Sequence, residues 1–157
     1  MTTSHPTAPP PVPTDPQALA DAVGAAMWSR DSATQALGMT LVRIAPGCAT
    51  VRMPIRADMA NGHGMCHGGF MFTLADSAFA YACNSYNLNT VASGCNIDFL
   101  APGRIGDVLE AEAVERSAKG RTGVYDVTVR VLGGKTVALF RGKSYRIQGE
   151  VIAGLTA

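Results

Sequence analysis

Residues 68–84 read GGFMFTLADSAFAYACN, and this stretch decides the fold. Its side chains are apolar on most sides of a helix, so the sequence predicts a helix that other elements wrap rather than one laid on a surface. The stretch is at the short end for a membrane span, and Asp76 interrupts its apolar run. We therefore expect a buried helix and no membrane-spanning segment.

The segments on either side of this helix predict an antiparallel sheet. Two short strands precede it, Thr40–Ala45 and Ala49–Ile55, joined by a turn at Pro46-Gly47. After it we expect four strands, two of them with clear alternation of apolar and polar residues, at 90–100, 107–116, 122–132 and 136–147. A curved antiparallel sheet around one central helix is the hotdog arrangement, an α+β fold.

Two short helices are predicted before the first strand. Asp15 followed by Pro16 is typical of an N-cap and a first helical residue, so the first helix is expected to run to about Ser29. A second helical piece is expected over residues 32–37, and it ends at Gly38.

The length of 157 residues fits a single domain with one core. We expect the domain at residues 15–149. A disordered Pro-rich arm is expected before it, at residues 1–14, and a frayed tail after it, at residues 150–157.

Composition and charge narrow the possible partners. Hydrophobic residues make up 47% of the chain and charged residues 16%, which indicates a further buried surface such as an oligomer interface. The formal net charge is +1, so no electrostatic feature points to nucleic acid or to an acidic membrane face.

The cysteines, Cys48, Cys66, Cys83 and Cys95, form no CxxC pair and match no zinc spacing. The Pro-rich N-terminus lacks the apolar region of a secretory signal. We therefore expect reduced, buried thiols in a cytoplasmic protein.

Asp76 is the residue that does not fit its surroundings. It is the only Asp, Glu, Lys or Arg between Asp58 and Asp98, and it lies in the middle of the predicted helix. An unpaired carboxylate there costs several kcal/mol, so it is expected to be paired, hydrogen-bonded or protonated. A carboxylate kept at that cost is a candidate for catalysis, and the alternative is a structural role such as capping a loop.

A glycine-rich loop, Asn61 to Gly69, leads directly into this helix. The start of a helix presents free N–H groups, and Gly68 and Gly69 let another group approach that backbone closely. Together they could polarise a carbonyl or hold an oxyanion, or they could simply form a tight turn.

Geometry then constrains the predicted site. Gly68 and Asp76 are eight residues apart, roughly 12 Å along a helix axis, so Asp76 cannot reach a carbonyl bound at Gly68 of its own helix. Two such helices packed antiparallel across a two-fold axis would bring the two residues together. The sequence therefore predicts a dimer with two shared sites.

Four segments resemble the hotdog thioesterase superfamily, in particular the phenylacetate-pathway acyl-CoA thioesterases of the PaaI type. They are residues 59–85, 91–107, 122–131 and 135–147, and the HGG…LAD run followed by IDFLAPG is a fairly specific combination. The resemblance implies a double-hotdog dimer, usually paired again into a homotetramer. It also implies hydrolysis of phenylacetyl-CoA, hydroxyphenylacetyl-CoA or a related acyl-CoA, with no metal and no cofactor beyond the CoA thioester.

The same resemblance assigns roles to residues. Asp76 corresponds to the carboxylate that acts as general base or nucleophile, and the N–H of Gly68 corresponds to the group that binds the thioester oxygen. His67 and Asn61 match residues that position the thioester and the water. The candidate substrate-binding residues are Gly69, Ser93, Gly94, Phe99, Lys119, Arg121 and Arg146. For the basic residues the alternative is ordinary solvated charge, and Ser93 is the candidate for a hydroxyl that some members carry on the strand facing the site.

Three other functions stay open at this point. A hotdog enoyl-CoA hydratase or dehydratase also uses a carboxylate and a histidine, but here His63 and His67 lie in the loop before the helix. A metal site at His63, Cys66 and His67 has helical spacing, which the surrounding glycines disfavour. A non-catalytic acyl-CoA-binding module on the same fold is the third alternative.

Overall fold

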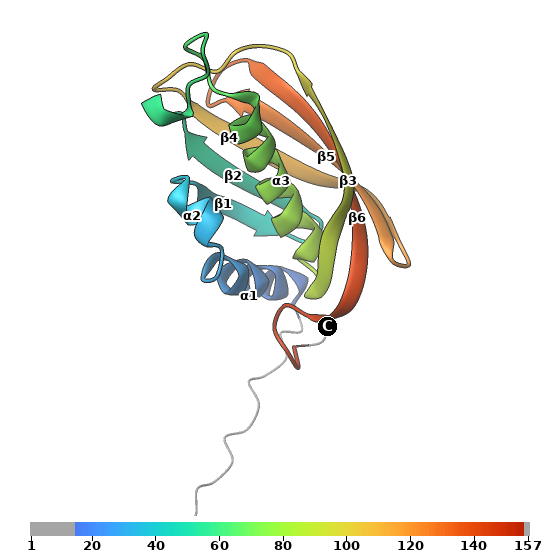
Figure 1. Ribbon diagram of the computed structural model, residues 1–157. Coiled ribbons are helices and arrows are strands. Elements are labelled where there is room, and N and C mark those ends of the chain that lie inside the picture. The colour runs from blue at the N-terminus through green and yellow to red at the C-terminus, as the bar shows by residue number, and fades with distance from the viewer. Residues whose placement is uncertain (1–14, 156–157) are drawn as a thin grey trace, which may run out of the picture.

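The computed structural model describes residues 15–155, and Figure 1 shows its elements in chain order. Its helices are α1 (Pro16–Trp28), α2 (Ser32–Ala36) and α3 (Gly68–Asn84), with a short 3-10 helix, η1, at Ala57–Met59. Its strands are β1 (Thr40–Ala45), β2 (Cys48–Pro54), β3 (Leu88–Phe99), β4 (Val108–Lys119), β5 (Thr122–Val131) and β6 (Thr136–Glu150).

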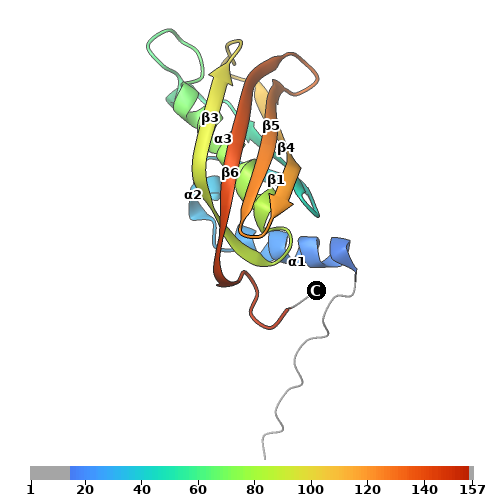
Figure 2. The ribbon, with the colours of Figure 1, turned by 90° about the vertical axis from the view of Figure 1, so that its right-hand side faces the viewer.

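The strands form one antiparallel sheet in the order β1-β2-β4-β5-β6-β3. The sheet curves around α3, and β1 and β3 are its two edges (Figures 1 and 2). Within the described residues β3 pairs with β6 alone, so the backbone along its other edge is unpaired in a single chain. This arrangement confirms the predicted α+β hotdog fold.

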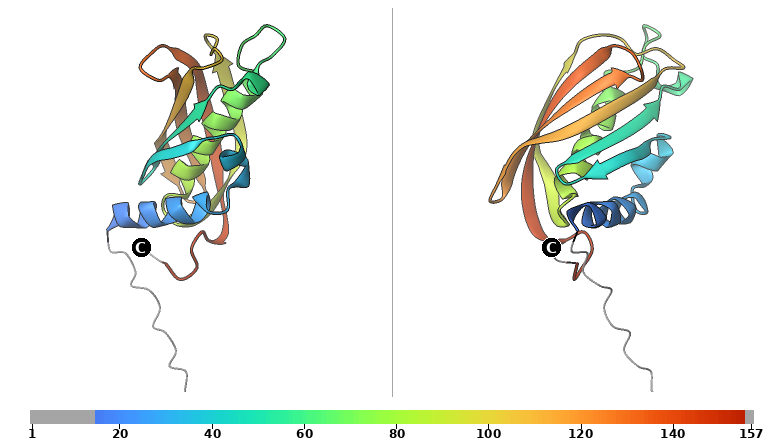
Figure 3. Two further views of the ribbon diagram at one scale, coloured as in Figure 1. Left: turned by 90° about the vertical axis from the view of Figure 1, so that its left-hand side faces the viewer. Right: turned by 180° about the vertical axis from the view of Figure 1, so that it is seen from behind.

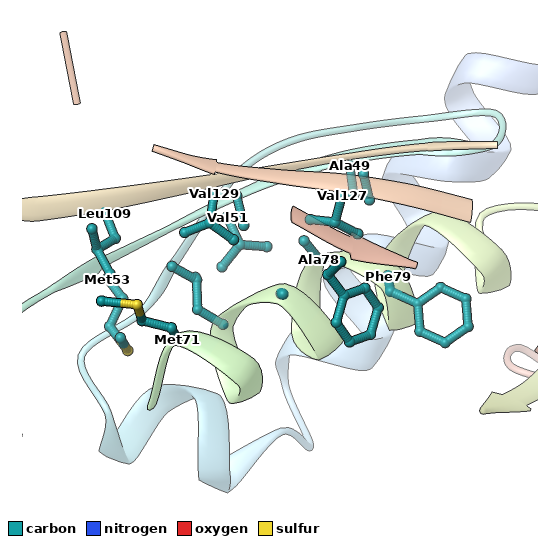
Figure 4. Packing of buried hydrophobic residues seen from close by; sticks show 14 of the residues in the cluster. Ala49, Val51, Met53, Met71, Ala78, Phe79, Leu109, Val127 and Val129 are labelled. Atoms are coloured by element: carbon teal, nitrogen blue, oxygen red, sulfur yellow. The ribbon is translucent and has the colours of Figure 1, made fainter. Parts of the chain in front are cut away.

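The core lies between α3 and the concave face of the sheet. Val51, Leu109 and Val127, from β2, β4 and β5, are buried against the helix (Figure 4). Phe79 of α3 packs against Gly142 of β6, where an added Cβ would lie 2.9 Å from the ring, so the absence of a side chain there makes room for the ring. Burial of this apolar surface is the main favourable contribution to folding.

The helix α1 lies across one end of the sheet, against β1 (Figures 1 and 3). Its predicted start is confirmed, because the carboxylate of Asp15 accepts hydrogen bonds from the N–H groups of Gln17 and Ala18 at 3.3 and 3.1 Å. Gly24 allows close packing, since a Cβ there would lie 2.9 Å from a methyl carbon of Ile44 in β1.

The predicted fraying of residues 150–157 is wrong for the part that the structure describes. β6 continues to Glu150, and Leu155 is only 7% exposed because it packs against apolar side chains of α1. The Asn87 side chain bonds to the backbone on both sides of this turn, which ties the segment to the start of β3. The predicted arm, residues 1–14, and the last two residues lie outside the described residues.

The other predicted element bounds agree with the structure to within three residues. α3 and β1 have the predicted bounds, whereas β4 ends at Lys119 instead of residue 116. The strand is longer because Lys119 pairs with Thr122 across a tight turn, so the ladder between β4 and β5 continues to the end of the hairpin.

All four cysteines are free, but the expectation that all of them are buried is wrong. Cys66 and Cys83 are buried, whereas Cys48 and Cys95 are half-buried. Among the helices of residues 15–155, none is long and apolar enough to cross a membrane.

Candidate active site

Asp76 lies on the half-buried side of α3. Burial raises the pKa of its carboxyl above the ordinary value for an aspartate. In the described part of the chain no basic side chain forms an ion pair with it, and its one hydrogen-bond partner is Cys95, whose Sγ lies 4.0 Å from Oδ1. A partly desolvated carboxylate without a counter-ion is suited to take a proton from water or to attack a carbonyl carbon.

Asp76 belongs to a stripe of small residues on one face of α3, which we call the Asp76 stripe: Gly69, Thr73, Asp76 and Ala80. Each is at least partly exposed, because the sheet covers the opposite side of the helix. The Thr73 hydroxyl donates to the carbonyl oxygen of Gly69 at 2.8 Å, so its hydrogen is already used within the helix. Asp76 is therefore the stripe's remaining group for chemistry, and the small side chains leave room for a second helix.

The backbone N–H groups of the two glycines at the start of α3 differ in their hydrogen bonding. His67 is the N-cap, and its Nδ1 accepts a hydrogen bond from the N–H of Gly69 at 2.9 Å. The N–H of Gly68 donates to no group among the described residues, so it is the free donor at this helix start. Because Nδ1 is the acceptor, the neutral imidazole of His67 carries its proton on Nε2, where it can donate to a ligand.

Asn61 and Phe99 meet Gly68 at a pocket of about 500 Å³. The Phe99 ring stands directly over Gly68, where an added Cβ would lie 2.9 Å from the ring carbon Cζ. The side-chain oxygen of Asn61 accepts hydrogen bonds from the N–H groups of His63 and Met65, so it shapes the loop. Of the Asn61 side chain, only the NH2 group remains to donate to a water or a carboxylate. The other lining residues are Met65, Cys66, Met71, Leu100, Ala101 and Pro102, which make the pocket largely apolar.

The basic residues lie elsewhere in a single chain. Arg121 and Arg146 line a depression of about 510 Å³, and Lys119 lies two residues before Arg121 at the same hairpin. On the β3–β6 ladder, Thr90 pairs with Arg146 and Phe99 pairs with Ala138, so roughly 26 Å of β6 separates this depression from the Phe99 pocket. In one chain, therefore, Phe99 lines one pocket and Arg121 and Arg146 line another, so these predicted substrate-binding residues do not share a groove.

The strand that faces Asp76 presents a thiol rather than the predicted hydroxyl. Ser93 lies at a bulge in β3 and its hydroxyl donates to the carbonyl oxygen of Lys143 at 3.1 Å, so it bonds to β6 and not to the carboxylate. Gly94, the next residue, has no atom within 4 Å of where a Cβ would be. Cys95 then points toward α3. Sequence analysis missed this residue, although the inward alternation of Cys95 and Ile97 could have indicated it.

The metal-site alternative has no support in the site's geometry. His63 and His67 lie in the loop before α3 and not on a helix, so their spacing of four does not place them on one face. In the region from Asp15 to Leu155, no three His, Cys, Asp or Glu side chains are grouped so that they could hold a metal ion.

Comparison with known proteins identifies the family. A family model described as the thioesterase superfamily matches residues 63–138, which include most of the glycine-rich loop and all of α3. The acyl-coenzyme A thioesterase PaaI of Escherichia coli is 52% identical over 126 residues, which are 80% of this chain and 90% of that protein. The chain belongs to the thioesterase superfamily.

Solved structures agree with this thioesterase in fold. The E. coli PaaI protein from the phenylacetic acid degradation operon superposes with a TM-score of 0.85 and 49% identity, covering 87% of this thioesterase and 99% of that chain. A Streptococcus mutans protein with bound acetyl CoA has a TM-score of 0.68 and 26% identity, over 71% and 90% of the two chains. The predicted family is confirmed.

Proposed function

We propose that this thioesterase hydrolyses phenylacetyl-CoA, hydroxyphenylacetyl-CoA or a related aryl- or acyl-CoA to the free acid and CoA. The observation that carries the proposal is the presence, on one helix, of a free N–H at Gly68 and a desolvated carboxylate at Asp76. The similar E. coli protein is named an acyl-CoA thioesterase of phenylacetic acid degradation, and the similar S. mutans protein holds acetyl CoA. Both support a CoA thioester as the substrate. We propose that the reaction needs no metal and no further cofactor.

The proposed mechanism begins at Gly68. Its N–H donates to the thioester carbonyl oxygen and stabilises the negative charge that develops there. Asp76 takes a proton from water while the water oxygen attacks the carbonyl carbon, or its carboxylate attacks that carbon to give an anhydride that water then cleaves. In both routes the carbon–sulfur bond breaks, and the electron pair leaves with the CoA thiolate, which takes up a proton. The Asn61 amide and the His67 imidazole hold the water and the thioester.

The proposed site is shared between two chains. Gly68 and Asp76 are about 12 Å apart along α3, too far to act on one carbonyl group. The unpaired edge of β3 and the partly exposed Asp76 stripe are adjacent, so a second copy can pair its own β3 and α3 on this side of the molecule. A two-fold axis there would bring Asp76 of each chain toward Gly68 of the other. We propose a dimer of this kind, and two such dimers as a tetramer.

The two pockets divide the substrate. The apolar pocket beside Gly68 and Phe99 suits the acyl group or the pantetheine chain, and the depression at Arg121 and Arg146, near Lys119, suits the phosphates of CoA. The distance between the apolar pocket and the basic depression within one chain is compatible with this proposal, because each site of the proposed dimer contains residues of both chains. Four free cysteines also support our proposal that the protein acts in a reducing compartment, the cytoplasm.

The first test measures thiol release from a panel of acyl-CoA thioesters. Rapid release from aryl-acetyl-CoA by the wild type, abolished in Asp76→Ala, supports both the reaction and the catalytic residue. Hydration of an enoyl-CoA, followed by absorbance, would favour the hydratase alternative. Binding of CoA without any turnover would favour a binding module.

A second test addresses the shared site directly. Asp76→Asn and Gly68→Val are purified separately and then mixed under conditions that exchange subunits. Each mixed dimer keeps one intact site, made of Gly68 from one chain and Asp76 from the other, so random exchange restores about one quarter of wild-type activity. A site within one chain would give no recovery, because neither variant carries both residues. Mixing each variant with itself is the control.

A further inference from the structure

The thiol of Cys95 occupies the position across from Asp76 because of the bulge in β3. In the β3–β6 ladder Ala92 pairs with Ser144 and Gly94 pairs with Lys143, so Ser93 is the extra residue. The extra residue resets the alternation of the strand after it. Cys95 and Ile97 consequently face α3, whereas Asn96 faces away.

Cys95 differs from Cys83, a cysteine of α3, in what its sulfur contacts. Cys83 lies on α3 itself, is 4% exposed, and donates to the carbonyl oxygen of Ala80 at 3.5 Å, so its hydrogen is used within the helix. Cys95 is half-buried, and its one hydrogen bond in the described residues is to Oδ1 of Asp76, at 4.0 Å. The thiol therefore contacts the carboxylate at the limit of hydrogen-bonding distance for sulfur.

The protonation of the two groups is compatible with this contact. Desolvation first, and the charge of Asp76 second, raise the pKa of the Cys95 thiol, so it stays protonated at neutral pH and acts as a donor. Of the other titratable groups around α3, Tyr125 of β5 donates to Glu115 at 2.9 Å, and Tyr81 donates to Asp31, the N-cap of α2. The charge of Asp76 also contributes to the raised pKa of the Cys83 thiol, but that thiol donates to Ala80 and not to the carboxylate. Among the described residues Cys95 is the donor available to Asp76 from its own chain.

We propose that Cys95 is a positioning residue, whose S–H holds Oδ1 of Asp76 so that Oδ2 faces the water or the acyl carbon. This inference rests on the proposed catalytic role of Asp76. A donor at Oδ1 fixes the rotation of the carboxylate, and a few tenths of an ångström in the placement of a base change its rate of proton transfer. A donor also stabilises the ionised form, which offsets part of the cost of desolvation.

The test compares two substitutions that differ in the donor. Cys95→Val keeps an apolar side chain of similar size and removes the donor, whereas Cys95→Ser keeps a donor. We expect Cys95→Val to lower kcat about tenfold with KM within about twofold, and to raise the apparent pKa of the acid limb of kcat/KM by about half a unit or more. Cys95→Ser is expected to keep most of the wild-type kcat and its acid limb.

Cys48→Val is the matched control, because Cys48 is also a free, half-buried strand cysteine but lies in β2, away from Asp76. It should match the wild type in kcat and in pH profile. Circular dichroism checks that each variant is folded, and Cys95→Ala takes the place of Cys95→Val if the latter is unfolded.

Two outcomes overturn the proposal. One is a folded Cys95→Val enzyme with the wild-type kcat and acid limb. The other is a Cys95→Ser enzyme as impaired as Cys95→Val, which would show that only side-chain shape matters. Asp76→Asn is measured in the same series, since an active Asp76→Asn would remove the catalytic role of Asp76 itself and so separate that failure from a failure of the inference about Cys95.

Discussion

The two faces of α3 place opposite demands on one helix. On the sheet side, Leu74, Ala78 and Phe79 are at most 1% exposed and fill the core. On the other side, the Asp76 stripe is only partly covered by its own chain and holds a carboxylate whose ionisation is opposed by its surroundings. The residues that stabilise the fold and those proposed for chemistry therefore differ in burial although they lie on the same helix, so mutations should separate stability from activity.

The largest expected effect is on the stripe face. Asp76→Asn should lower kcat by about a thousandfold or more, because it removes the base or nucleophile while keeping the shape of the side chain. Measured thiol release decides this. A variant that keeps the wild-type kcat would show that the stripe is not the chemical face.

The same variant is expected to lose activity but to gain stability at neutral pH. Folding raises the pKa of Asp76, so its contribution favours the folded state below the ordinary pKa of aspartate and is lost as pH rises through the raised value. The difference in Tm between Asp76→Asn and the wild type should therefore be more positive at pH 7 than at low pH. Thermal unfolding followed at both pH values tests this, and an unchanged difference would mean that the carboxylate is not desolvated.

On the sheet face, Phe79→Ala should cost stability and not chemistry. The ring packs against Tyr125, Phe140 and Gly142, and its removal leaves a cavity that costs about 3 kcal/mol, roughly a hundredfold in the folding equilibrium. At a temperature where the variant is folded, kcat should stay within about twofold of the wild type. Urea unfolding and thiol release are measured on the same preparation. A folded variant that loses both stability and kcat would show that the two faces of α3 are not independent.

A smaller effect on kcat is expected for a substitution at the start of α3. Gly68→Ala places a Cβ 2.9 Å from the Phe99 ring, so the ring or the helix start must shift, and kcat should fall about thirtyfold. Phe99→Leu in the same chain gives the Cβ more room and should recover part of the loss. No recovery in the double variant would show that the ring is not what opposes the added methyl group.

The smallest effect is expected far from α3. Arg146→Gln, alone and with Arg121→Gln, should raise KM for an acyl-CoA about fivefold with kcat unchanged, since these residues are proposed to hold only the phosphates. The increase should shrink at high salt, which screens the wild-type contact. The control substrate is an acyl-pantetheine thioester, which lacks the nucleotide phosphates and should show equal KM in the variants and the wild type.

Much of the fold could be predicted from local patterns. A charge inside an apolar stretch is visible without any structure, and so are an Asp-Pro helix start and alternating strands, because each depends on neighbours in the chain. The prediction of a frayed tail was wrong because the order of this segment depends on residues that are distant in the sequence. Leu155 is buried by contacts with α1, about 130 residues earlier in the sequence, which no local pattern reveals.

By itself, the sequence determined the wrapped helix, the antiparallel strands, the thioesterase family and Asp76 as the residue out of place, since these follow from side-chain periodicity and from motifs within short segments. Only the tertiary structure decided between alternatives that look alike in the sequence. His67 takes the N–H of Gly69 and leaves that of Gly68 free, and a one-residue bulge turns Cys95 instead of Ser93 toward Asp76. The physical reason is that donor occupancy and strand register depend on which backbone groups meet in space.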